Sequence, residues 1–133
     1  MVFETNEIPS KIAYKLLSTS DNPVEVTDSA EGGSSPDVAY MSSSSWVIVY
    51  ETDGTIYAQI FANSGSTRYS AIQVTPSDGV TYLYPSVAMI DDVAPEIVIV
   101  YQGNDDIYMT ILSTSGVTLL SNNLVNTEHS TGT

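Results

Sequence analysis

The chain has 133 residues and a mass of 14.3 kDa, the size of one ordinary domain with a hydrophobic core. It carries 16 acidic side chains against three lysines and arginines, and the formal net charge of −13 repels phosphate backbones and anionic lipid headgroups. Nucleic acid is therefore not an expected partner. Because 42% of the residues are hydrophobic and only 14% are charged, the composition also differs from that of a disordered acidic tail.

Several enzyme classes need residue types that this sequence lacks. With no cysteine there is no thiolate nucleophile, no disulfide and no cysteine zinc site, and the single histidine, His129, cannot form a histidine metal centre. Many serines are present, but a nucleophilic serine needs a base and a third orienting group, so no catalytic triad is expected. No carboxylate pair is singled out by its spacing as the machinery of a glycoside hydrolase. We predict that the protein is not an enzyme.

The sequence contains no targeting or membrane-spanning pattern. Its first residues lack the basic start and apolar run of a signal peptide, and no stretch reaches the ~18 apolar residues that cross a bilayer. Membrane insertion is therefore not expected. Few lysines and arginines, no cysteine and many serines and threonines are typical of a secreted or cell-surface bacterial protein, which predicts an extracellular or cell-surface location. A cytoplasmic acidic protein is the alternative.

The chain repeats itself at an interval of about fifty residues, and a shortened copy opens it. Pro-Asp-Val-Ala at 36–39 returns as Pro-Ser-Val-Ala at 85–88, and Trp-Val-Ile-Val-Tyr at 46–50 is answered by Ile-Val-Ile-Val-Tyr at 97–101. We therefore divide this single repeat domain into a partial repeat at 1–28, full repeats at 36–75 and 85–127, and a tail at 128–133.

Each full copy contains four short apolar or alternating segments separated by turn residues, which predicts four antiparallel strands and no helix. The first strand, at 38–41 and 87–90, is so apolar that we expect both of its faces to be buried. The second strand, at 46–50 and 97–101, is rich in β-branched residues and has the same continuous apolarity. The residues expected in the core are Trp46, Ile48, Ile97 and Ile99.

Turn chemistry separates the later strands of each copy. Two-residue turns that tolerate positive φ predict tight hairpins into the third strand, and they are Asp53-Gly54 and Asn104-Asp105. The third strand covers 56–61 and 107–112 and ends at a glycine turn. The fourth, near 72–75 and 124–127, is the most polar and is expected at an exposed sheet edge.

Four antiparallel strands in every copy of about fifty residues predict an all-β fold whose units are the blades of a β-propeller. A β-sandwich is the alternative, and it explains the strands equally well but gives no reason for a repeat at a fixed interval. Closed propellers have about four to eight blades. The chain is therefore expected to be a fragment of a ring, or a protomer that completes a ring with copies of itself.

The phrase Pro-x-Val-Ala, Trp-Val-Ile-Val-Tyr-Glu, Asp-Gly, Ile-Tyr-Ala-Gln-Ile-Phe and Ser-Gly resembles the tandem repeats of very large bacterial secreted or surface proteins. The resemblance extends from residue 2 to about residue 127. It implies a propeller-like β-repeat in an extracellular, often adhesin-like setting, and it brings no catalytic residues with it. The leading hypothesis is a noncatalytic structural or adhesive module whose partners are copies of itself in a homo-oligomer or neighbouring repeats of a longer chain. A propeller lectin that binds a glycan is the alternative, and a fragment of a glycoside-active enzyme is third.

Aromatic residues are the candidates for ligand binding, since their faces stack on sugars. The tyrosines that recur at matching positions are expected to pack between blades, and they are Tyr50 with Tyr101 and Tyr57 with Tyr108. Three others, Tyr69, Tyr82 and Tyr84, do not recur and stand among polar residues. We predict that these three contact a ligand if the chain binds one.

Acidic residues on turns and loops are the only candidates for binding a hard cation such as calcium, which takes six to eight oxygen ligands. They are Asp53, Asn104, Asp105 and Asp106 on hairpins, with Asp91, Asp92 and Glu96 on a longer loop. No spacing matches an EF-hand or a glycine-rich calcium repeat, so solvated acids are the favoured interpretation and no cofactor is predicted. Adjacent carboxylates repel unless a cation separates them. The pairs Asp91/Asp92 and Asp105/Asp106 are therefore the predicted ligands if a calcium site exists.

Overall fold

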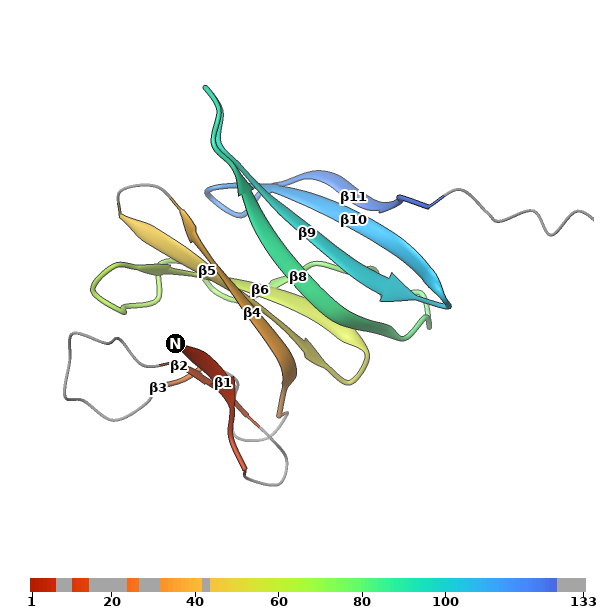
Figure 1. Ribbon diagram of the computed structural model, residues 1–133, viewed down its shortest axis with the longest axis horizontal. Coiled ribbons are helices and arrows are strands. Elements are labelled where there is room, and N and C mark those ends of the chain that lie inside the picture. The colour runs from red at the N-terminus through yellow and green to blue at the C-terminus, as the bar shows by residue number, and fades with distance from the viewer. Residues whose placement is uncertain (7–10, 15–23, 27–31, 42–43, 127–133) are drawn as a thin grey trace, which may run out of the picture.

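The computed structural model describes residues 1–6, 11–14, 24–26, 32–41 and 44–126, and every regular element within them is a β-strand (Figure 1). The strands form three antiparallel sheets, here named A, B and C in chain order. Sheet A contains β1 (Val2–Glu4), β2 (Ile12–Tyr14) and β3 (Val24–Glu25). Sheet B contains β4 (Ser34–Met41), β5 (Ser45–Thr52), β6 (Thr55–Ala62) and β7 (Ile72–Gln73). Sheet C contains β8 (Tyr82–Ile90), β9 (Glu96–Gly103), β10 (Asp106–Ser113) and β11 (Thr118–Leu124).

These sheets confirm the prediction of an all-β fold with four antiparallel strands in each full copy. In sheets B and C the strands lie side by side in chain order, so each sheet is a simple meander. The two predicted hairpins are present, with positive φ at Asp53 (48°), Gly54 (75°), Asn104 (49°) and Asp105 (69°). Such turns match the right-handed twist of the strands that they join.

The fourth strand differs from the prediction in two respects. In sheet C it is β11 and ends at Leu124, so the strand predicted near 124–127 lies almost wholly before that range. In sheet B the strand β7 is an edge strand, as expected, but the residues after it turn inward: Val74 and Thr75 are 5% and 3% exposed. The side chain of Val74 packs in the core, and Thr75 Oγ1 accepts a hydrogen bond of 3.1 Å from the backbone N–H of Ile56.

Sheet B lies between the other two sheets and contributes to two cores. Strand β8 of sheet C packs against β4, β5 and β6, which creates the B/C core. Its buried members include Val47 and Val49 of β5 with Ile97 and Ile99 of β9. On the opposite side of sheet B the A/B core contains Ile12, Tyr14, Trp46, Ile48, Tyr50 and Phe61.

The alternation of side chains along β5 explains why its whole sequence is apolar. Successive residues of a strand point to opposite faces, so Trp46 and Ile48 enter the A/B core while Val47 and Val49 enter the B/C core. All four residues predicted to be in the core are buried, since Trp46 is 9% exposed and Ile48, Ile97 and Ile99 are 0% exposed. That prediction is confirmed.

The prediction that the first strand is buried on both faces was wrong. On β4, Val38 and Tyr40 are 42% and 62% exposed, and on β8 the side chain of Ile90 is 44% exposed. The apolar sequence indicated two covered faces, but only one face of β8 meets another described sheet, and the second face of β4 meets sheet A mainly through the three-residue strand β1. Burial of the second face depends on which sheets are present, and sequence periodicity cannot show that.

Candidate functional site

The three tyrosines predicted to bind a ligand do not converge. The backbone N–H of Tyr82 donates to Gly54 O (2.8 Å), at the start of β6, whereas Tyr69 N–H donates to Ile60 O (3.4 Å), near the end of β6. Six residues of a β-strand separate those acceptors by about 20 Å. Tyr69 and Tyr82 therefore lie near opposite ends of sheet B.

Tyr82 is a core residue in this structure. It is 2% exposed, and its ring meets Tyr101 and Tyr108 edge-on with centroid distances of 5.5 and 5.8 Å. Its ring also lies against the backbone of β9, because a Cβ atom added to the facing Gly103 would be only 2.6 Å from Tyr82 Cε1. The ring is packed within the core, and ligand binding by Tyr82 stays a prediction.

A polar network joins the hydroxyl groups of this aromatic cluster. Tyr82 donates to Asp78 Oδ2 (2.9 Å) and accepts from Asn122 Nδ2 (3.0 Å). Tyr101 in turn donates to Asn122 Oδ1 (3.0 Å) and lies 2.7 Å from Thr110 Oγ1. Buried hydroxyl groups need such partners, since an unpaired buried polar group is costly. This network gives both tyrosine hydroxyl groups hydrogen-bond partners, and it links β8, β9, β10 and β11.

The network changes the acidity of its members. Burial, followed by the hydrogen bond to Asp78, raises the pKa of Tyr82 to about 12. Hydrogen bonds from the Val80 N–H and from the Tyr82 hydroxyl lower the pKa of the Asp78 carboxyl. Burial also raises the pKa of Tyr101.

We expect the free energy of unfolding to fall between about pH 10 and about pH 12. Below about pH 10 Tyr82 is protonated in both the folded and the unfolded chain, and its contribution is fully present. As the pH rises towards the folded-state pKa of about 12, the unfolded chain loses its proton first, which lowers the stability of the folded state. Urea unfolding at a series of alkaline pH values measures this loss. Tyr82→Phe should show a shallower decline, whereas Tyr69→Phe, which changes an exposed residue, should behave as wild type.

Tyr84 is the most exposed of the three tyrosines, at 64%. Its φ is 55°, and Ser35, at the same position of the preceding repeat, has φ of 51°. Both residues stand directly before a proline, at a break in the register with the next strand. This repeated irregularity turns the Tyr84 side chain outward, and Tyr84 remains the best placed of the predicted ligand contacts.

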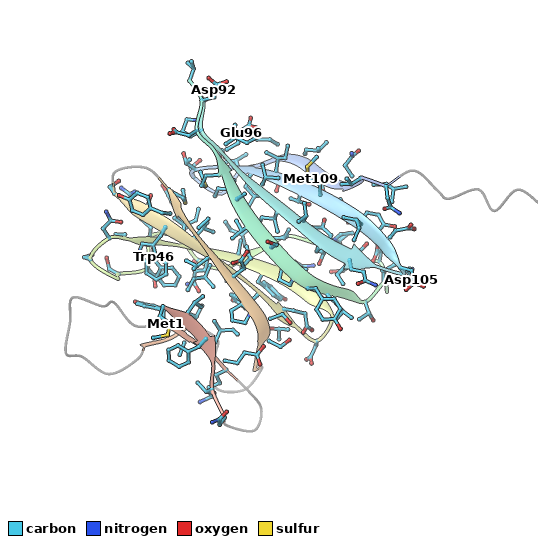
Figure 2. The ribbon with its side chains drawn as sticks, viewed as in Figure 1. Met1, Trp46, Asp92, Glu96, Asp105 and Met109 are labelled. Atoms are coloured by element: carbon cyan, nitrogen blue, oxygen red, sulfur yellow. The ribbon has the colours of Figure 1, made fainter. Side chains whose placement is uncertain are left out.

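The predicted calcium pairs lie far apart. Asp91 and Asp92 belong to the loop before β9, and Asp105 and Asp106 lie at the turn after it, so the length of β9 separates them (Figure 2). Glu96 is at the Asp92 end of β9. Asp53 is on the turn between β5 and β6 of sheet B, which matches the turn between β9 and β10 of sheet C. In the described parts of the chain no three acidic or histidine side chains gather in a way that could hold a metal ion. Asp106 is also engaged, because its Oδ1 accepts a hydrogen bond of 2.9 Å from Asn126 Nδ2.

We expect salt, rather than calcium specifically, to raise the melting temperature. The net charge of −13 is relieved by general screening, which requires about 0.1 M of any salt. Calcium titrated at constant ionic strength should therefore add little. A melting-temperature rise that saturates below about 1 mM calcium and is reversed by a chelator would instead reveal a specific site.

The sequence did not single out the carboxylates that join one sheet to the next. Asp37 on β4 accepts hydrogen bonds of 2.9 Å from both Ser86 Oγ and the backbone N–H of Val87 on β8. Glu4 on β1 likewise accepts from the backbone N–H of Ser35 on β4. Each carboxylate therefore binds the next sheet close to the register break of its first strand, in β8 for Asp37 and in β4 for Glu4. One sequence signal could have pointed to Asp37: the Pro-x-Val-Ala motif has Asp37 at its second position in one repeat and Ser86 there in the next.

Arg68 contacts Ser44 with an Nη1 to Oγ distance of 3.4 Å. His129 and the tail at 128–133 lie outside the described residues. No helix in the described segments is long and apolar enough to cross a membrane.

Comparison with family models, with curated proteins and with solved structures finds no match to this chain.

Proposed function

We propose that the chain is a noncatalytic structural module made of successive β-repeats that are arranged like consecutive blades of a β-propeller. The observation that carries this proposal is the position of sheet B, which has a core on each face. In a two-sheet sandwich each sheet has one core face, and the other commonly meets solvent. A sheet covered on both sides supports a series of stacked repeats.

The contacts between sheets also support a series of stacked repeats, because the turn after the third strand contacts the preceding sheet at both junctions. At the junction of sheets A and B, the Tyr14 hydroxyl donates to the carbonyl of Gly65 in the turn after β6. At the junction of sheets B and C, the matching Gly116 lies close to sheet B, where a Cβ atom would be 2.4 Å from Ile72 Cδ1. Each glycine turn therefore packs on the preceding sheet, which is how a repeating unit propagates.

The sheets approach one another most closely through their first strands. Strand β8 packs against β4, whereas the outermost strands β7 and β11 have no comparable contact in the described part of the structure. Units whose most extensive contact runs through their first strands suit a radial arrangement. This geometry supports the blade interpretation.

We place the module outside the cell, in an adhesive or architectural role, on the basis of its composition and of the repeats that it resembles. Its partners in this role are further repeats of its own kind. The lectin alternative gains no support from the predicted tyrosines, since Tyr82 is buried and Tyr69 lies near the opposite end of sheet B from Tyr82.

A glycan array tests the choice between these functions. The structural proposal expects no binder. Millimolar or tighter binding of a sugar, lost in Tyr84→Ala, would contradict the proposal and establish a lectin. Tyr84 is suited to this test because its exposed side chain can be removed with little effect on folding.

A further inference from the structure

Sheet C has a second apolar face that is open in the described part of the chain. Ile97, Ile99 and Tyr101 of β9 enter the B/C core, so the residues between them point the other way. Directly paired residues of antiparallel strands share a face, which places Val98 with Ile111 and Val100 with Met109. We name this the outer face, and it consists of Ala88, Val98, Val100, Ile107, Met109 and Ile111.

Every position of the outer face has a counterpart on sheet B that sheet C covers. Val47 is paired with Ile60, and Val49 with Ala58, in the rows that correspond to Val98 with Ile111 and Val100 with Met109. These four residues of sheet B are all 0% exposed. The outer face of sheet C therefore has the same strand pairing and the same apolar character as the face of sheet B that sheet C buries.

Exposure differs at matching positions because only one of the two faces is covered. Ile56 of sheet B is 0% exposed, whereas its counterpart Ile107 is 40% exposed. Met41 is 2% exposed, whereas its counterpart Ile90 is 44% exposed. Side chains of similar character are buried in one repeat and open in the next.

The residues that follow the last strand of each sheet make the same backbone hydrogen bond in all three sheets. The backbone N–H groups of Val26, Val74 and Val125 donate to the carbonyls of the matching isoleucines of β2, β6 and β10, at 2.7, 2.8 and 2.8 Å. After sheets B and C the next side chain also makes the same contact, since Thr75 Oγ1 and Asn126 Oδ1 accept from the N–H of Ile56 and Ile107. After sheet B this exit leads into the strand that covers sheet B. Asn126 therefore stands where the link to a covering repeat would begin.

We propose that the outer face of sheet C is the docking surface for a further four-stranded repeat of the same type, joined to this chain through Asn126. This inference rests on the proposed function and names its partner. The incoming repeat would bring what sheet C brings to sheet B: a Pro-x-Val-Ala first strand and a β-branched second strand with an apolar inner face.

Single-cysteine labelling tests this proposal cleanly because the chain contains no cysteine. Three variants are compared: Val100→Cys on the outer face, Val49→Cys at the matching covered position, and Val93→Cys on the fully exposed loop before β9. In the chain itself we expect a maleimide to react quickly at positions 93 and 100 and slowly at position 49. The same variants are then made in a lengthened chain, in which Asn126 is followed by a second copy of residues 76–126.

In the lengthened chain we expect labelling at position 100 to slow by at least about tenfold, while labelling at position 93 is unchanged. Slow labelling at position 49 in the lengthened chain reports that sheets B and C are still packed. If position 49 is slow but position 100 stays fast, the added repeat does not dock and the inference is wrong.

Two other outcomes have separate meanings. Concentration-dependent protection of position 100 in the original chain would show that a second copy covers the face, which overturns the choice of partner. Fast labelling at position 49 in the original chain would show that sheets B and C do not pack, which overturns the proposed function itself.

Discussion

Replacing Ile99 by aspartate is expected to unfold the domain. The side chain is 0% exposed in the B/C core, on the central strand β9. The substitution removes apolar burial and places a charge without a partner among hydrocarbon side chains, an effect of more than about 4 kcal/mol. A domain of this size is stable by only about 5–15 kcal/mol. Far-UV circular dichroism should show loss of the β-sheet signal at temperatures where the wild type is folded.

Val98→Asp is the matched control for this experiment. Val98 is the neighbouring residue of the same strand, but it belongs to the outer face and is half-buried, so an aspartate there can reach water. We expect this variant to fold, with a loss of about 1–2 kcal/mol. If both variants unfold to the same extent, the assignment of the two faces of sheet C is wrong.

Replacing Trp46 by alanine is expected to lower the free energy of unfolding by about 3–5 kcal/mol. The indole stacks on Phe61 with a centroid distance of 4.6 Å and meets Tyr14 edge-on at 4.8 Å, beside sheet A (Figure 2). Its Nε1–H donates to the carbonyl of Ala62 at 3.0 Å. Urea unfolding followed by circular dichroism measures the loss, since the variant has no tryptophan left to report by fluorescence.

Tyr40→Ala provides the comparison for Trp46. Tyr40 faces Trp46 across the β4–β5 pair but is 62% exposed. Its removal deletes only a cross-strand contact, with an expected loss of about 1 kcal/mol or less. Equal losses in the two variants would mean that the buried contacts of Trp46 add no more stability than the exposed contacts of Tyr40.

The sequence by itself determined the first three strands of each full copy and the hairpins between the second and third strands. Alternating and β-branched segments can bury apolar surface only as strands, and Asp53-Gly54 and Asn104-Asp105 accept the positive φ that a tight hairpin requires. These are local properties of a few adjacent residues. The repeat also predicted that the recurring tyrosines pack between successive units. Tyr50 lies in the A/B core and stacks on its cross-strand neighbour Tyr57 at 5.8 Å, and Tyr101 lies in the B/C core and stacks on Tyr108 at 6.3 Å.

The candidate site was much less predictable. Sequence reasoning selected Tyr69, Tyr82 and Tyr84 because they do not recur, yet the fold buries Tyr82 and leaves Tyr84 exposed. The difference comes from the register break at Tyr84, where a positive φ redirects one side chain of the strand. A residue's lack of recurrence does not reveal which way its side chain points.

Only the tertiary structure decided which apolar faces are covered and which polar groups meet. Val49 and Val100 stand in almost the same local sequence, but one is buried because sheet C lies over it and the other has no described sheet above it. The contact of Asp37 with Ser86 and Val87 likewise joins residues about fifty positions apart. The strand pattern follows from the conformational preferences of neighbouring residues, whereas burial and inter-sheet hydrogen bonds follow from the stacking of whole sheets.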